Sequence, residues 1–205
     1  YTDNIIISTW INPEVKPSKR FLEKNGVIYI EDDPEKYSSF LKFNNVHLQA
    51  ATSLNGMKVV KTKYAIKVRT DESYSDLNIF IDTMKSNEEL LITSEPFYRR
   101  PLSKRYDEEY AYSMISDHVM GGKTKKIRKM FSTTSKKCRT HKIPQITTFR
   151  GVQYCPEDLL RDCFQGEFKI VHMEDLGRFW CKVGNARITN KTYKNYENYG
   201  TEIKP

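Results

Sequence analysis

The residues in this chain whose types could do chemistry are mostly scattered, and one small group has metal-ligand spacing. Cys138 and His141 stand three positions apart, and Cys155 or Cys163 could complete a set of ligands for zinc. Structural zinc sites are usually built from two such close pairs, and the sequence has no second pair. We therefore expect reduced thiols and no metal site, although the spacing leaves open whether Cys138 and His141 bind a metal.

Sequence motifs for catalysis are absent. The chain has no P-loop, no glycine-rich dinucleotide turn, no nucleophile elbow and no HExxH zinc motif. Its 4 histidines are far apart in the sequence, and no two carboxylates have a spacing that argues for a paired acid and base. We therefore expect a protein that binds a partner, without enzymatic activity and without a cofactor.

One part of the chain is strongly basic. Residues 103–205 carry 20 basic and 12 acidic side chains, whereas residues 1–102 carry 14 of each. No acidic residue occurs between His118 and Pro156. Such a run favours a polyanionic partner such as DNA, because counterion release drives the binding of phosphate backbones. The candidate binding residues are Lys123, Lys125, Lys126, Arg128, Lys129, Lys136, Lys137, Arg139, Lys142 and Arg150.

The elements that must position these residues are expected to be mainly β strands. Short β-branched or aromatic runs bounded by turn residues predict strands at 4–8, 27–30, 58–61, 64–69, 77–84, 90–93, 167–172 and 178–183. A helix is expected at 156–164, where a proline and two acids form the first turn, and a weaker one at 104–119. This spacing of strands favours a barrel or a sandwich.

The chain is expected to divide into two parts. An irregular N-terminal arm covers residues 1–20, and one domain covers residues 21–205. A loop-like insertion at about 103–148 contains the basic run and is rich in Gly, Ser and Thr.

The order of these segments resembles a bromo-adjacent homology (BAH) domain. Within that family it is similar to the domain of the largest origin recognition complex subunit and of the related silencing protein. Two segments carry most of the resemblance: LITSEPFYRRP at 91–101 is similar to the aromatic strand of the family, and RFWCKV at 178–183 to its final strand. Residues 63–73, 77–84, 151–155 and 164–171 resemble the segments around these two.

This resemblance implies a distorted β-barrel with a few short helices, in a nuclear, non-enzymatic module that binds chromatin. The implied partners are the nucleosome, through a histone tail or nucleosomal DNA, at replication origins or in gene silencing. Some members act as histone readers and hold a methylated lysine in an aromatic cage. The positions that match the cage are Phe97, Tyr98 and Tyr154, with Tyr74 as a further candidate.

Two alternatives remain open. The chain could be a protein-interaction module that recruits a silencing or replication partner, with the basic run at 123–129 serving only nuclear import. It could also be a nucleic-acid-processing enzyme with a fold that the sequence does not reveal.

Overall fold

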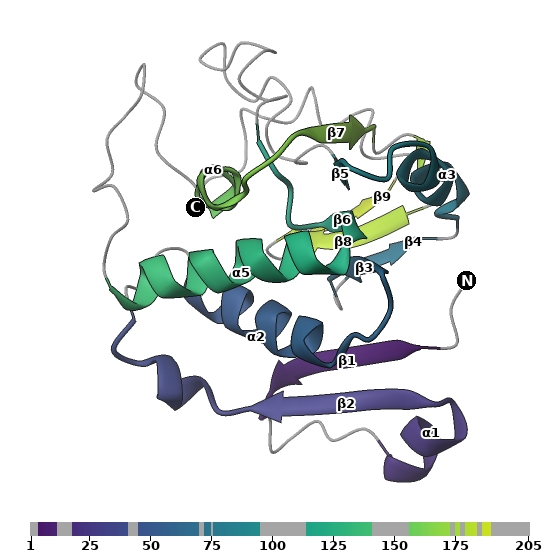
Figure 1. Ribbon diagram of the computed structural model, residues 1–205. Coiled ribbons are helices and arrows are strands. Elements are labelled where there is room, and N and C mark those ends of the chain that lie inside the picture. Colours follow the sequence, from purple (N-terminus) through teal and green to yellow (C-terminus); the bar gives the residue numbers. More distant parts are fainter. Residues whose placement is uncertain are drawn as a thin grey trace.

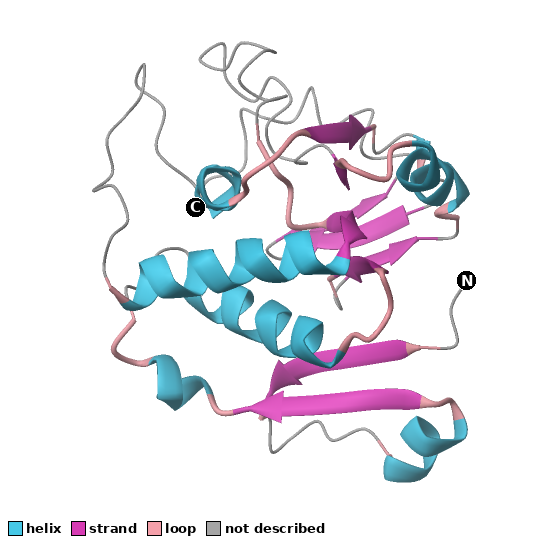
Figure 2. Cartoon of the chain, in the orientation of Figure 1, coloured by secondary structure: helices cyan, strands magenta, loops and turns pink. Residues whose placement is uncertain are grey.

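Helices and strands are interspersed along the chain (Figure 1, Figure 2), so the fold is mixed α/β. The sheets of the described part of the chain are open, and none of them closes into a barrel. The expected mainly β fold with a distorted β-barrel is therefore wrong. The computed structural model describes residues 4–11, 18–40, 45–69, 72–74, 76–94, 114–140, 156–172, 175–176, 179–183 and 186–189.

The described structure begins with a β-α-β unit. Strand β1 (Ile5–Trp10) pairs in parallel with β2 (Val27–Asp32), and the short helix α1 (Lys19–Lys24) lies between them in the sequence. The side chain of Ser18 starts α1 by accepting a backbone N–H of its first turn. The arm expected at 1–20 therefore contains a strand and the start of a helix.

Four strands form the central sheet, in the order β3-β6-β5-β7. They are β3 (Tyr64–Val68), β6 (Val119–Lys123), β5 (Leu91–Ser94) and β7 (Phe168–Val171). Strand β6 runs antiparallel to both of its neighbours, and β5 runs parallel to β7. Hence the carboxyl ends of β3, β5 and β7 lie at one edge of the sheet, together with the residues that lead into β6.

Three helices cover one face of the central sheet: α2 (Val46–Val59), α5 (Thr124–Arg139) and α6 (Pro156–Cys163). Leu91 and Met120 point from the sheet into the apolar cluster that these helices form. Helix α5 lies against both α2 and α6 (Figure 1).

Helix α3 (Asn78–Ser86) covers the other face. Ile92 and Val119 point to that side and pack in one cluster with Phe80 of α3. Gly121 allows the close approach, since a Cβ at this position would lie 2.8 Å from Cε1 of Phe80. The central sheet is therefore buried on both faces, which explains why β5 and β6 are continuous buried runs without alternation.

A smaller antiparallel sheet has the order β4-β8-β9 and consists of β4 (Glu72–Tyr74), β8 (Phe179–Val183) and β9 (Ala186–Thr189). A short 3-10 helix, η1 (Pro34–Tyr37), follows β2. Among the described helices, none has the length and apolar character needed to cross a membrane.

The basic run forms α5 and the strand before it, and these described residues are not the loop that the sequence predicts. The buried residues Ile127, Met130, Phe131, Thr134 and Cys138 recur every three or four positions, as on one face of a helix. Basic side chains occupy seven of the other positions of the helix, and this high density of charge hides the helical spacing of the apolar residues in the sequence.

One segment predicted as a strand is helical, and a second is helical in its first half. Leu77, Phe80, Ile81 and Met84 follow the helical spacing i, i+3, i+4, i+7, and they lie at or within α3. The predicted strand at 58–61 begins with the last residues of α2.

The other predicted elements have a mixed outcome. Of the helix expected at 104–119, residues 114–118 are not helical and 104–113 lie outside the described residues. The strands predicted at 4–8, 27–30, 64–69, 90–93, 167–172 and 178–183 are confirmed as β1, β2, β3, β5, β7 and β8, and the helix predicted at 156–164 is confirmed as α6.

Replacing Phe131 by alanine tests whether α5 belongs to the core. Phe131 is completely buried, so Phe131→Ala leaves a cavity and should lower the free energy of unfolding by about 3–5 kcal/mol. Its exposed neighbour provides the control, since Ser132→Ala should change that free energy by less than about 0.5 kcal/mol. Urea denaturation of both variants gives the comparison. Equally small effects would show that α5 does not pack in the core.

Candidate functional site

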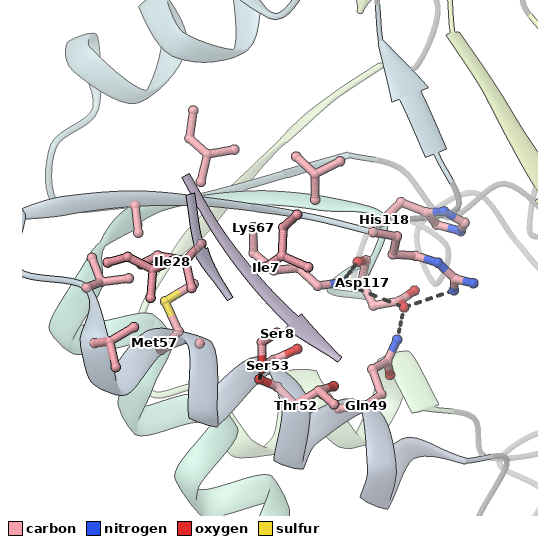
Figure 3. A pocket seen from close by; sticks show the side chains of 18 of the residues that line it. Ile7, Ser8, Ile28, Gln49, Thr52, Ser53, Met57, Lys67, Asp117 and His118 are labelled. Carbon is pink, nitrogen blue, oxygen red and sulfur yellow. Dashed lines mark hydrogen bonds and ion pairs between the residues drawn. The ribbon is translucent and has the colours of Figure 1, made fainter. Parts of the chain in front are cut away.

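A cavity of about 1240 Å³ lies between the β1–β2 pair and the central sheet. Helix α2 lines it and is held against β1, because the Ser8 hydroxyl donates a hydrogen bond of 2.7 Å to the carbonyl of Thr52. Figure 3 shows that the cavity is not uniform: Ile28 and Met57 lie on one side, and Gln49, Asp117 and His118 lie on the other. We call the second region the polar end of the cavity, formed by Gln49, Lys67, Arg69, Asp117, His118 and Glu157.

The polar end lies where α/β proteins commonly bind ligands, outside the carboxyl ends of their parallel strands. Lys67 and Arg69 stand at the end of β3, and Asp117 directly precedes the antiparallel strand β6. Trp10, the last residue of β1, also lines the cavity. The topology of the two sheets therefore gathers these side chains at one edge.

Asp117 is the centre of the hydrogen bonding at the polar end. Its side chain is 5% exposed, and Oδ2 accepts a hydrogen bond of 3.1 Å from Nη1 of Arg69. The amide of Gln49 also donates to Oδ2, and Nζ of Lys67 lies 4.0 Å from it while donating to the Asp117 carbonyl (Figure 3). One carboxylate thus connects α2 to the end of β3.

The surroundings of Asp117 keep its side chain ionised. Burial by itself would raise the pKa of this carboxyl, but Lys67, His118 and Arg69 together outweigh burial and lower the pKa below its usual value. Asp117 is therefore a fixed negative charge at neutral pH.

A second carboxylate connects the small sheet to the same edge. The side chain of Glu72 in β4 is 1% exposed, and its Oε1 lies 3.4 Å from Nε of Arg69 and is bonded to Nδ1 of His118. The hydroxyl of Tyr74 donates to its Oε2 at 2.8 Å. Arg69 is therefore held between Asp117 and Glu72, which fixes the direction of its guanidinium.

Glu157 in the first turn of α6 is the unusual group of the site. The residue is 3% exposed, and its Oε2 has no hydrogen-bond partner among the described residues. Burial raises the pKa of this carboxyl to about 7, against the smaller lowering effects of a backbone hydrogen bond and of Arg69. At neutral pH Glu157 is therefore divided between its acid and its carboxylate forms, whereas Asp117 is ionised.

This difference in protonation is what acid–base chemistry requires. A group with a pKa near the working pH can accept a proton from a reacting hydroxyl, and a permanently ionised neighbour can fix charges around it. Lys67 and Arg69 add positive charge that suits a phosphate or carboxylate group of a ligand.

The expected aromatic cage stays a prediction, because only one of its four candidates is described. Phe97, Tyr98 and Tyr154 lie outside the described residues. Tyr74 is half-buried and packs against the cluster that contains Phe80. Its hydroxyl bonds to Glu72, so the described contacts of Tyr74 are those of a packed structural residue.

The predicted DNA-binding residues that the structure describes lie in α5 or directly before it, and several make contacts within the protein. Lys123 and Lys126 both bond to Glu89. The guanidinium of Arg128 donates to the carbonyls of Met57 at 3.0 Å and Val60 at 3.1 Å. The others on α5 are Lys125, Lys129, Lys136, Lys137 and Arg139, and Lys142 and Arg150 lie outside the described residues.

Among the cysteines expected as reduced thiols, the structure describes the side chains of two. Cys138 and Cys163 are free and buried in one apolar cluster. Burial, followed by the effect of Cys163, raises the pKa of the Cys138 thiol to about 11. Within the described residues, no group of three His, Cys, Asp or Glu side chains could hold a metal ion, and His141 and Cys155 lie outside them.

The residues of the polar end were not predicted from the sequence. One signal was available, because Lys67 and Arg69 alternate at the end of a predicted strand. This alternation does not indicate a ligand site unless the β-α-β unit formed by β1, α1 and β2 is also recognised. Once that unit is recognised, polar residues after the following strands become candidates for a ligand site.

A comparison with protein families gives one match. A family model described as WavE lipopolysaccharide synthesis matches residues 2–134, well over half of the 205 residues. The matched segment contains every residue of the polar end except Glu157. No curated protein and no solved structure matches the chain.

This match overturns the resemblance to a BAH domain and what that resemblance implies. The matching family is bacterial and linked to lipopolysaccharide synthesis. The expected chromatin function is therefore wrong, together with the nucleosome, histone-tail and DNA partners, the roles in replication and silencing, and the nuclear location. The alternative of a silencing partner with a nuclear-import signal fails for the same reason. The described runs that suggested the BAH family do not form one barrel: 77–84 is helical as α3, 91–94 is β5 of the central sheet, and 179–183 is β8 of the small antiparallel sheet.

The pKa of Glu157 gives a prediction for stability. Because the folded protein raises this pKa from 4.5 to about 7, the native state binds more protons between these pH values, and stability falls as the pH rises through this range. Glu157→Gln removes the titration. We compare the unfolding free energy of the variant minus that of the wild type at two pH values. This difference should be about 3 kcal/mol larger at pH 8 than at pH 4.5, in favour of the variant. Urea denaturation at several pH values measures this difference. A difference that stays constant across the range would contradict the raised pKa.

Proposed function

The chain belongs to the WavE lipopolysaccharide synthesis family, and we propose that it is a glycosyltransferase that moves a sugar from a nucleotide-activated donor to a lipopolysaccharide acceptor. One observation carries this proposal. The polar end of the cavity combines a buried carboxyl of pKa about 7, Glu157, with an ionised carboxylate and two cations. The synthesis of a lipopolysaccharide consists largely of sugar transfers. Such a transfer needs a base for the acceptor hydroxyl and positive charge for the phosphates of the donor.

The donor phosphates would bind at Arg69 and Lys67. A guanidinium presents parallel N–H groups that match two phosphate oxygens, and the ammonium of Lys67 adds a point charge. The side chain of Arg69 is 34% exposed, so it is accessible to a ligand while Asp117 and Glu72 hold it. Gln49 supports the same arrangement from α2 through Asp117.

Glu157 would act as the general base. Its carboxylate takes the proton from an acceptor hydroxyl as that oxygen bonds to the anomeric carbon of the donor sugar. The bond from this carbon to the phosphate oxygen breaks, and its electron pair leaves with the nucleoside diphosphate. Arg69 and Lys67 stabilise the negative charge on the leaving group. A base with a pKa of about 7 combines a substantial ionised fraction at neutral pH with useful basicity.

The sequence-based expectation of a protein that binds without catalysis stays a prediction, and turnover separates it from this proposal. A protein that only binds would hold a nucleotide-activated sugar without releasing nucleoside diphosphate. A glycosyltransferase releases one nucleoside diphosphate for each sugar that it transfers.

The variant Glu157→Gln tests the assigned base. Nucleoside diphosphate release is measured with a panel of uridine, thymidine, guanosine, adenosine and cytidine sugar donors and a lipopolysaccharide acceptor. We expect kcat to fall by about 100- to 10,000-fold, because the amide cannot accept the proton. The Kd of the free nucleoside diphosphate should change by less than about threefold, since Glu157 does not hold the phosphates. Glu167→Gln makes the same chemical change at an exposed position and should leave both quantities unchanged.

The variant Arg69→Gln should mainly change the Kd of the nucleoside diphosphate, whereas Glu157→Gln mainly changes kcat. Losing a charged hydrogen bond to phosphate should raise the Kd of the nucleoside diphosphate by roughly 10- to 100-fold. Two results would reject the proposed function: full turnover in Glu157→Gln, or no turnover by the wild type with any donor of the panel.

A further inference from the structure

The exposed side of α5 is a continuous basic surface that the cavity does not use. Four basic residues of this 16-residue helix are exposed at the spacing i, i+4, i+11, i+14, which places them along one side of the helix together with the exposed Ser132. We call them the basic stripe: Lys125, Lys129, Lys136 and Arg139. At 1.5 Å per residue the stripe is about 21 Å long.

The packing of α5 fixes the direction in which the stripe faces. Ile127, Met130 and Phe131 on the opposite side are at most 1% exposed and belong to the main apolar cluster. Arg128 attaches the helix to α2 through the carbonyls of Met57 and Val60. Figure 1 shows α5 on the near side of the molecule, between α2 and α6. The four cations are therefore presented together by a rigid helix.

The protein does not neutralise this charge within its described part. Glu89 pairs with Lys123 and Lys126 at the amino-terminal end of α5. None of the four stripe residues forms an ion pair with a described residue, and Lys129 bonds only to the neutral amide of Gln165, at 2.7 Å. The helix itself contains seven basic residues and no acidic one. A surface of this kind attracts an extended anionic partner.

We propose that the basic stripe docks the protein on a membrane surface rich in anionic phospholipid headgroups. The charge complementarity argues for this partner, because a planar anionic surface can meet four cations along a straight line of about 21 Å at once. The family supports a membrane as the partner, because the chain belongs to a lipopolysaccharide synthesis family and a lipopolysaccharide is anchored in a membrane by its lipid. The stripe thus brings the protein to the surface that carries the acceptor, and it does so whether or not the cavity transfers a sugar.

The test is a vesicle-binding measurement with a matched pair of variants. The full chain is mixed with vesicles of phosphatidylcholine alone, or of phosphatidylcholine with about 30% phosphatidylglycerol, and the bound fraction is measured by co-sedimentation. The stripe variant carries Lys125→Gln, Lys129→Gln, Lys136→Gln and Arg139→Gln. The control variant loses the same charge from exposed positions on other elements, through Arg20→Gln, Lys24→Gln, Lys85→Gln and Lys169→Gln.

We expect the wild type to bind the anionic vesicles and not the neutral ones. Each cation near an anionic surface contributes about fivefold to the partition coefficient, so the stripe variant should lose about 100-fold or more. The control variant should lose less than about fivefold, since its substituted residues lie away from the stripe. Raising the salt concentration to about 0.5 M should release the wild type, because it screens the attraction without altering the fold.

Several results would overturn the proposal. Equal losses in the two variants would show that only net charge matters. Equal binding of the wild type to both vesicles would exclude an electrostatic surface. Binding to lipopolysaccharide in neutral vesicles, with none to phosphatidylglycerol, would assign the stripe to the acceptor phosphates in place of the phospholipid. Turnover on a short water-soluble acceptor tests the cavity separately, and we expect the stripe variant to retain it.

Discussion

The buried carboxylate of Asp117 holds the polar end of the cavity together. It accepts hydrogen bonds from Gln49 on α2 and from Arg69 after β3, and its Oδ2 lies 4.0 Å from Nζ of Lys67. Without this carboxylate, Lys67 and Arg69 would lose the buried anion that they share, and Arg69 would keep its ion pair with Glu72. The wall of the cavity formed by α2 and the edge formed by β3 therefore depend on one ion-paired group.

The same arrangement explains why two carboxyls at one site behave differently. Asp117 has the effects of Lys67, His118 and Arg69 to offset its burial. For Glu157, Arg69 is the one cation that lowers the pKa, and the larger effect of burial raises it. The positive charge is thus distributed so that one carboxyl is always ionised and the other remains close to its titration point at neutral pH. The proposed sugar transfer rests on this combination of an ionised carboxylate and a carboxyl that titrates near neutral pH in one cavity.

Several strands could be predicted from the sequence, whereas the helices α1, α2, α3 and α5 and the site could not. Strands such as β1 and β5 are short runs rich in β-branched residues, and this local pattern is sufficient to predict them. Helix α3 was missed because its isoleucines and phenylalanine suggested a strand, although Leu77, Phe80 and Met84 have helical spacing. The site depends on contacts between distant residues, since Gln49 and Asp117 are 68 positions apart. The pKa of Glu157 follows from burial, which local sequence does not reveal.

The central claim is that a nucleotide-activated sugar binds at the polar end of the cavity. Hydrogen–deuterium exchange, measured with and without a saturating donor from the panel, tests it most directly. We expect slower exchange in three segments: the start of α2 at 45–52, strand β3 and Arg69 at 64–69, and the residues before β6 at 114–118. Helix α5 should exchange at the same rate in both states. Protection confined to α5, or no protection in these three segments under saturating donor, would contradict the claim.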